Sequence, residues 1–256
     1  EHKITFSAIT SAGSNENVDM LGKGEVNFAI LQGLYGSMAW QGKDQYEGKP
    51  QKNLRSISML WENIEQITIK SKFAKTGNIK DMKNLYGERF SISGRSSGSR
   101  VSTETIFNSL GIDYNKMDLE YLGYSPSSTA LQDGKIQGMT TPSGAPTSAV
   151  TNAFASIGND NIKVLDFTAE DLKAINDNYP VWNPYTIKAG TYPGQDKDIN
   201  TIAQPNLLVV TKDTPEETVY LLTKTIYENL PFLNSVHKAT LVMSLQKAID
   251  GLPMPL

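Results

Sequence analysis

The segment between residues 90 and 165 alternates short apolar runs with helical patterns, and this alternation constrains the fold more strongly than any other feature. Strand patterns occur at residues 90–93, 119–122, 136–140 and 162–165, and helical patterns separate them at residues 99–110, 127–132 and 147–155. Gly111 and Gly134 end the first two helices, and the connections are short. Repeated strand–helix–strand units predict a mostly parallel sheet with helices on both faces, so we expect an α/β fold.

The N-terminal part of the chain predicts another unit of the same kind. Residues 4–9 alternate as a strand, residues 18–21 have a short helical pattern, and residues 26–31 form an apolar strand. Two further strands, at residues 67–70 and 207–210, stand where one block of the pattern gives way to the next. The sequence therefore predicts that the chain crosses twice between two blocks.

A chain of 256 residues exceeds the usual size of one domain, roughly 100 to 200 residues. We expect two doubly wound α/β domains joined by hinge strands. Domain one comprises residues 1–70 and 207–256, and domain two comprises residues 71–206. A cleft between the two domains is the expected place for a ligand.

Composition argues against several classes of function. Apolar residues make up 39% of the chain, and the net charge of −3 is spread without a cluster of Lys and Arg. Nucleic acids and anionic membrane surfaces require clustered cations, so neither is expected as a partner. The chain has no cysteine and only two histidines, His2 and His237, so we expect neither a metal site nor a cofactor.

The loop GRSSGSR, residues 94–100, follows a predicted strand and precedes a predicted helix. It lacks the lysine of a nucleotide-binding P-loop. The free amides of a helix start, the hydroxyls of Ser97 and Ser99 and the small Gly98 suit one carboxylate, and Arg95 would add a bidentate contact if its side chain turned inward. The alternative is that Ser99 caps the helix and that Arg95 is a solvated surface residue.

The sequence PSGAP follows the strand predicted at residues 136–140 and contains Ser143, Gly144 and Pro146. It therefore lies at the same carboxyl edge of the predicted sheet as the GRSSGSR loop, and ligands of open α/β sheets bind at that edge. We expect these residues to line the ligand site. The alternative is an ordinary turn, because proline and glycine are the residues that turns prefer.

The first block offers four residues at matching strand ends, namely Ser14, Asn15, Gln32 and Trp61. For Trp61 the alternative is packing in the core. Acid–base catalysis requires a titratable pair, and the three loops at the strand ends supply only Glu16 as a carboxylate. We therefore expect a binding protein and no enzyme, with an enzyme that acts on a small anionic metabolite in the same cleft as the alternative.

Four stretches carry a resemblance to a known family. They are GSNENVDMLGKGEVNFAILQ (13–32), NLRSISML (53–60), SISGRSSGSRVSTETIFNSLGI (91–112) and YPVWNPYTIKAGTYPGQDKDINTIA (179–203). These stretches resemble the TAXI-type solute-binding proteins of TRAP transporters. The resemblance runs nearly from end to end, and IKAGTYPGQD is its most specific part.

The resemblance implies a two-lobed, type II periplasmic-binding-protein-like fold and an extracytoplasmic, periplasmic receptor. Such a receptor closes on a small carboxylate, a glutamate-like amino acid or a dicarboxylate, and delivers it to the membrane permease subunits of a TRAP transporter. We expect it to act as a monomer. By position, the matching residues are Ser97, Gly98 and Ser99 in the anion loop, Ser14, Asn15 and Gln32 in the domain-one wall, Gly144 and Pro146 in the domain-two turn, and Tyr192 in the signature that leads back to the hinge.

The sequence also departs from the pattern of this family. Its members usually begin with a strand, a Gly-rich Thr-Gly loop and a helix before the point that matches Lys3, and they usually end in a His-Pro-Gly-Ala-like tail. Neither feature has a counterpart in these residues. A missing first strand and loop would remove one wall of the site and expose core; the alternatives are that these residues lie outside this sequence or that this member is unusual.

Overall fold

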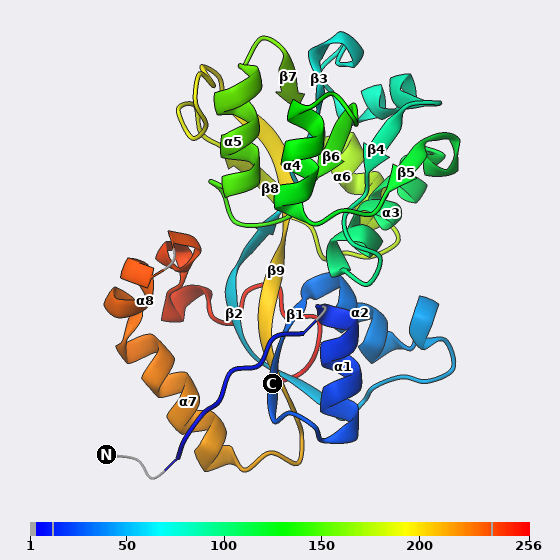
Figure 1. The fold of residues 1–256 in the computed structure, drawn as a ribbon. Helices are drawn as coiled ribbons and strands as arrows, with labels where there is room; N and C mark the ends of the chain where they lie inside the picture. The colour runs from blue at the N-terminus through cyan, green and yellow to red at the C-terminus, as the bar shows by residue number, and fades with distance from the viewer. Residues whose placement is uncertain (1–3, 12, 237) are drawn as a thin grey trace.

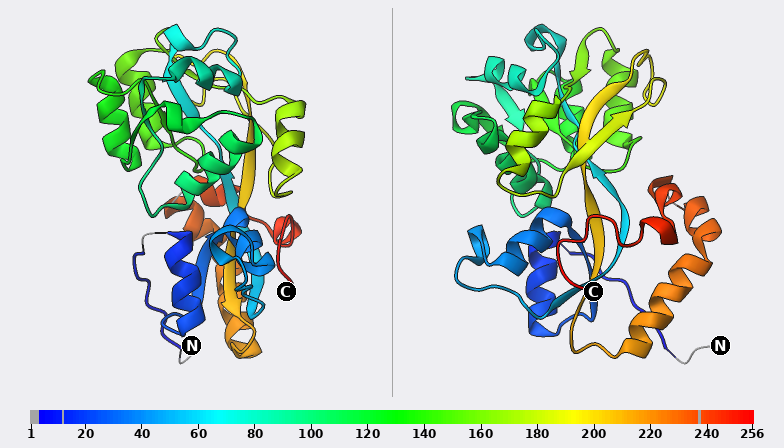
Figure 2. Two further views of the ribbon diagram at one scale, coloured as in Figure 1. Left: turned by 90° about the vertical axis from the view of Figure 1, so that its right-hand side faces the viewer. Right: turned by 180° about the vertical axis from the view of Figure 1, so that it is seen from behind.

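Two lobes, joined by two long strands, make up the structure of the protein (Figure 1). The computed structural model describes residues 4–11, 13–236 and 238–256. Strands β2 (Leu54–Ile64) and β9 (Ile199–Thr211) pair with each other and run from one lobe into the other. The two ends of the chain lie in one lobe, which we call the terminal lobe, and the middle of the chain forms the other, which we call the middle lobe (Figure 2).

The sheet of the terminal lobe contains β1 (Phe28–Gln32), β9 and β2 in that order. Both pairings are antiparallel: β9 places Leu208 opposite Ile30 of β1 and Leu207 opposite Met59 of β2. Strand β8 (Asn183–Ile187) pairs antiparallel with the first part of β9. Strand β9 therefore belongs to both lobes and holds the sheet of the terminal lobe together.

Residues 4–11 do not form the strand that the sequence predicts at residues 4–9. They run beside β1, where the ring of Phe6 meets the ring of Phe28 edge-on with centroids 5.7 Å apart. Within the part of the chain that the structure describes, no backbone–backbone hydrogen bond involves these residues. The predicted strand–helix–strand unit is not formed, because alternation indicates an extended chain without identifying its pairing partner.

The middle lobe contains a second sheet whose strands follow the order β5 (Asp118–Glu120), β4 (Arg89–Ser91), β6 (Gly138–Thr140), β3 (Ile67–Lys70) and β7 (Ile162–Val164). The parallel pairing that the sequence predicts holds for β4 with β5 and with β6. Strand β3 is antiparallel to β6 and β7. Strand β3, predicted as a hinge, thus lies inside this sheet, and the chain crosses between the lobes just before it.

Helices flank both sheets (Figures 1 and 2). In the terminal lobe α1 and α2 lie on one side of the long strands and α7 and α8 on the other, and in the middle lobe α4 packs on α5 and α3 on α6. None of the helices in residues 4–11, 13–236 and 238–256 is long and apolar enough to span a membrane. Their bounds are α1 (Ser14–Lys23), α2 (Gly33–Gln41), α3 (Gly98–Ser109), α4 (Tyr124–Gln132), α5 (Ser148–Ile157), α6 (Ala169–Asn176), α7 (Glu216–Glu228) and α8 (Leu230–Val236).

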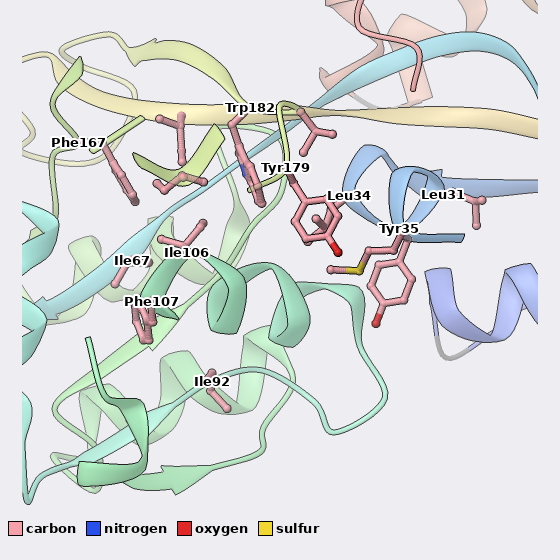
Figure 3. Packing of buried hydrophobic residues seen from close by; sticks show 14 of the residues in the cluster. Leu31, Leu34, Tyr35, Ile67, Ile92, Ile106, Phe107, Phe167, Tyr179 and Trp182 are labelled. Carbon is pink, nitrogen blue, oxygen red and sulfur yellow. The ribbon is translucent and has the colours of Figure 1, made fainter. Parts of the chain in front are cut away.

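The largest hydrophobic cluster continues from one lobe into the other. Figure 3 shows Leu34 and Tyr35 of α2 on one side of Tyr179 and Trp182, and Phe107 of α3 on the other. The side chain of Trp182 is buried, with 2% of the residue exposed. The lobes therefore share a core on the side where the strands cross, in addition to the strands themselves.

Candidate functional site

The GRSSGSR loop leads into α3, and Ser97 caps this helix. The Ser97 hydroxyl accepts a hydrogen bond from the amide of Arg100 at 3.2 Å and donates one to the carbonyl of Gly94 at 2.8 Å. The amides of Gly98 and Ser99 donate to no described residue. The start of α3 therefore keeps two backbone donors for an anion, and the capping role proposed as the alternative for Ser99 belongs to Ser97.

Ser99 has a different set of contacts. It is buried, and its hydroxyl lies 2.6 Å from the hydroxyl of Tyr124, which in turn donates to the carbonyl of Pro142 at 2.5 Å. Burial raises the pKa of Tyr124 to about 12, so its proton stays in place at neutral pH. This chain of hydrogen bonds connects the GRSSGSR loop to the PSGAP turn.

Residues of the terminal lobe meet the same loop from the other side. Gln32 ends β1, and its backbone amide donates to the Ser14 hydroxyl at 3.0 Å. The Gln32 side chain packs on the Cα atom of Gly98. A Cβ atom added to Gly98 would lie 2.6 Å from Gln32 Oε1. Gln32 Oε1 is buried and has no hydrogen-bond partner among the described residues. The structure thus brings Ser14, Gln32 and Gly98 together at a contact between the lobes.

Asn15 lies next to this contact. Its side-chain oxygen accepts from the Tyr46 hydroxyl at 3.2 Å. A cavity of about 340 Å³ separates α1 from the GRSSGSR loop, and it is lined by Asn15, Glu16, Asp19, Met20, Lys23, Glu25 and Ser96. Both lobes therefore contribute to a polar cavity beside the start of α3.

Arg95 does not turn inward toward the amides of α3. Its guanidinium lies over the ring of Tyr121, 3.9 Å from the centroid, and its side chain is exposed. A stacked guanidinium of this kind contributes about 0.5 to 1 kcal/mol at an exposed site. Arg95 thus has a packing partner that lies far from it in the sequence, and its charge stays on the surface.

The PSGAP turn packs against the strand that crosses between the lobes. Ser143 and Ile64 exchange backbone hydrogen bonds at 3.0 and 3.1 Å, and the Ser143 and Thr147 hydroxyls bond to each other. Gly144 faces the C-terminal part of the chain, since an added Cβ atom would lie 3.0 Å from the Cβ atom of Ala239. Pro146 follows a cis peptide bond. These residues surround the crossing and lie apart from the Gln32–Gly98 contact.

Two further predicted site residues pack in apolar clusters. Tyr192 is buried and stacks on Phe154 with ring centroids 5.4 Å apart, and its hydroxyl donates to the side chain of Gln66. Trp61 packs beside Leu60 in the cluster between β2, β9 and α7. Trp61 thus has the core environment that the sequence leaves open as the alternative.

Sequence reasoning missed Glu65, the most deeply buried carboxyl group at the crossing. It is 0% exposed, and its Oε1 atom accepts hydrogen bonds from Ser102 at 2.5 Å, Trp182 at 3.2 Å and Gln204 at 3.3 Å. Burial raises the pKa of Glu65 to about 7, and the three hydrogen bonds oppose that rise. The signal was a lone carboxylate in NIEQITI, where recurring isoleucines indicate a buried strand and a solvated charge is out of place.

The two-lobed α/β architecture with two crossing strands is that of periplasmic-binding-protein-like folds. A profile of the NMT1-like family matches residues 1–256, and the chain belongs to this family. The sequence alone did not establish this membership.

Solved structures share the fold at low sequence identity. A protein from Bordetella bronchiseptica RB50 is 13% identical with a TM-score of 0.52, over 96% of this chain and 72% of the other. The GluR0 ligand-binding core from Nostoc punctiforme, solved with L-glutamate, is 12% identical with a TM-score of 0.49, over 93% of this chain and 84% of the other. The periplasmic aliphatic sulphonate binding protein SsuA from Escherichia coli is 12% identical with a TM-score of 0.46, over 90% of this chain. The chain spans 59% of the length of SsuA.

Proposed function

We propose that the protein is a solute-binding receptor that captures a small carboxylate between its lobes. The observation that carries this proposal is the start of α3, where the backbone amides of Gly98 and Ser99 donate to no described residue and Gln32 approaches from the other lobe. Backbone amides at a helix start bind anions, and a carboxylate that accepts from two amides gains charge-assisted hydrogen bonds. The side-chain amide of Gln32 supplies a donor from the terminal lobe.

The receptor works by closure of the lobes on the ligand. In this proposal the two domains are those expected from the sequence, residues 1–70 with 207–256 and residues 71–206, except that β3 (Ile67–Lys70) belongs to the second. Contacts from both lobes favour the closed arrangement, so the affinity for the ligand includes the free energy of closing. Ser14, Gln32, Gly98 and Ser99 form the ligand site, and Asn15 adds a polar group beside it.

The subclass in this proposal is the TAXI type, with a TRAP permease as membrane partner and an extracytoplasmic location. The four stretches described above support this subclass, and membership of the NMT1-like family accords with a periplasmic-binding-protein-like receptor. Glutamate-like amino acids and dicarboxylates are the ligands of choice for a test. The receptor returns its ligand chemically unchanged, unlike an enzyme.

The test is thermal unfolding against amino acids and dicarboxylates at millimolar concentration. A ligand at about 100 times its dissociation constant adds about 2.7 kcal/mol, which raises Tm by several degrees in a chain of this size. The ligand is then recovered and analysed by mass spectrometry, and a changed ligand indicates an enzyme. A panel without any shift contradicts the proposed ligand class.

The double variant Ser97→Ala and Ser99→Ala weakens binding by about 1 to 3 kcal/mol, because the loop loses the Ser97 cap and the Ser99–Tyr124 hydrogen bond that hold its amides in place for charge-assisted bonds. Isothermal titration with the ligand found in the panel measures this change. Ser125→Ala is the matched control, since Ser125 is an exposed serine in the first turn of α4. If the double variant and the control bind the ligand with equal affinity, the GRSSGSR loop is not part of the ligand site.

A further inference from the structure

Glu65 lies where the chain first crosses from the terminal lobe to the middle lobe. Its Oε1 atom receives all three hydrogen bonds to the carboxyl group, from Ser102 on α3, from Trp182 and from Gln204 on β9. Its Oε2 atom is buried and has no hydrogen-bond partner among the described residues. One half of the carboxyl group is therefore satisfied, and the other half is isolated from water and from donors.

Gln204 extends this network into the terminal lobe. Its Oε1 atom accepts from the amide of Leu34 at the start of α2 at 2.9 Å, and its Nε2 atom also donates to the Ser102 hydroxyl at 3.0 Å. A continuous path of hydrogen bonds thus leads from α2 through Gln204 and Glu65 to α3. This path joins the helix of one lobe to the helix of the other, and α3 begins at the proposed ligand site.

The network favours a neutral Glu65. An ionised carboxyl group in a buried place requires a cation or donors on both oxygens, and none of the ion pairs within residues 4–11, 13–236 and 238–256 involves Glu65. A proton on Oε2 removes that charge. The raised pKa of Glu65 has burial as its largest cause, in agreement with this geometry.

Titratable groups on the surrounding elements do not replace the missing cation. Tyr124 on α4 is an acid and supplies no positive charge. Burial raises its pKa, and a negative charge on Glu65 raises that pKa further. Arg100 on α3 is paired with Glu104 at 2.5 Å. Strand β9 carries no titratable residue. Arg55 on β2 and Lys70 on β3 form no ion pair with Glu65 among the described residues. Other titratable groups on adjacent elements are Glu62 on β2, Tyr35 on α2, Tyr179 near Trp182 with its partner Asp44, and Tyr192, which bonds to Gln66.

We propose that Glu65 is a proton-dependent latch between the lobes: its carboxyl group is protonated when the lobes are closed and ionised when they separate. Separation of α2 from α3 breaks the bond between the Leu34 amide and Gln204, which frees the Gln204 side chain and admits water to Oε2, so the open form has an ordinary carboxyl group. Closure of the lobes therefore takes up a proton. Because the proposed function captures its ligand by closure, ligand capture takes up this proton as well. Since the pKa is higher in the closed form, closure is favoured at low pH, weakens as the pH rises through the range between the open and closed values, and levels off above about pH 7.

The test measures the separation of the lobes directly and without ligand. The chain has no cysteine, so Lys52→Cys in the terminal lobe and Lys135→Cys in the middle lobe introduce two exposed positions for spin labels. Pulsed electron paramagnetic resonance then gives the distance between the labels from about pH 5 to 8. We expect the ratio of closed to open molecules to fall by up to about tenfold per pH unit below pH 7. A distance distribution that does not change with pH overturns the proposal.

Glu65→Gln keeps the shape of the neutral side chain and removes its titration, so this variant stays closed across the whole range. Glu62→Gln is the matched control, because Glu62 is a half-buried glutamate near the end of β2, three residues before Glu65, and burial also raises its pKa. We expect Glu62→Gln to behave as the unchanged protein. A pH profile that persists in Glu65→Gln, or that disappears in Glu62→Gln, overturns the proposal.

A second measurement does not require Glu65→Gln to fold. In protein labelled with ¹³C at glutamate carboxyl groups, the infrared band of a protonated carboxyl is recorded as a function of pH in the Glu62→Gln background. A band lost with a midpoint near pH 7 supports the latch. Its absence at pH 6 overturns the latch.

L-Glutamate serves as the ligand probe, because its own carboxylates are ionised above about pH 5. If the distance between the spin labels changes with pH but the protein binds no glutamate, the result supports the latch and counts against the proposed ligand. Glutamate binding with the same affinity from about pH 5 to 8 overturns the latch and leaves the receptor in place.

Discussion

Gly98 lets the two lobes approach each other at the start of α3. The side chain of Gln32 occupies the space that a Cβ atom at this position would fill, at 2.6 Å from Oε1. Gly98 has no positive φ angle, so close approach and not backbone conformation requires a glycine here. The same close approach brings Gln32 to the start of α3, where the amides of Gly98 and Ser99 donate to no described residue.

Gly98→Ala pushes the Gln32 amide away, and the predicted result is a loss of affinity for the carboxylate ligand of about tenfold or more. Stability changes by less than about 1 kcal/mol, because the end of a flexible side chain can move. Titration calorimetry and thermal unfolding measure the two quantities. Gly123→Ala is the control, because Gly123 also precedes a helix and its added Cβ atom meets only Pro126 at 3.9 Å. Unchanged affinity in Gly98→Ala places the ligand elsewhere.

Single residues were predictable where their neighbours in sequence decide their role. The small residues at the start of α3 predict free amides, and the backbone amides of Gly98 and Ser99 donate to no described residue. Anion binding at these amides stays a prediction. Arg95 and Glu65 were not predictable, because their partners are distant in sequence: Tyr121 for one, and Trp182 and Gln204 for the other. A buried charge is visible in a sequence only as an exception within an apolar run.

At the scale of elements, α3 depends on its cap. Ser97→Ala removes the acceptor for the Arg100 amide, and we predict a loss of about 1 kcal/mol in the free energy of unfolding, or about 2 to 4 °C in Tm. Ser97→Asp restores an acceptor and adds a negative charge at the helix start, so Tm recovers. Thermal unfolding measures both variants. A Tm of Ser97→Ala equal to that of the unchanged protein contradicts the capping role.

Ser97→Asp also separates stability from binding. The added carboxylate repels a carboxylate ligand at the amides of α3, so the variant is stable and binds at least about tenfold more weakly. A ligand with a neutral or cationic group at this place would bind Ser97→Asp as well as it binds the unchanged protein. Titration calorimetry distinguishes these outcomes.

Element types were more predictable than element partners. The patterns at residues 99–110, 127–132 and 147–155 correspond to α3, α4 and α5. The antiparallel pairing of β1 with β9 joins segments that about 180 residues separate, and no local pattern carries that information. For the same reason the sequence placed β3 at a hinge, while its hydrogen bonds place it between β6 and β7.

At the scale of the whole molecule, the shared core makes the lobes one cooperative unit. The largest cluster runs from Leu34 and Tyr35 through Trp182 to Phe107, so neither lobe keeps its core intact if the other unfolds. We predict one calorimetric transition, with equal calorimetric and van't Hoff enthalpies. Two resolved transitions would show that the lobes unfold independently.

The place of β9 also sets the order in which the molecule can assemble on the ribosome. The sheet of the middle lobe uses strands between residues 67 and 164, so all of them have been synthesised before β9 begins. In the terminal lobe, β1 and β2 each pair with β9 and not with each other, although both precede it by more than a hundred residues. Strands β1 and β2 must therefore wait, unpaired, until residues 199–211 emerge. During that interval the nascent terminal lobe exposes two unpaired strands, and it is the part of the chain that a chaperone would have to protect.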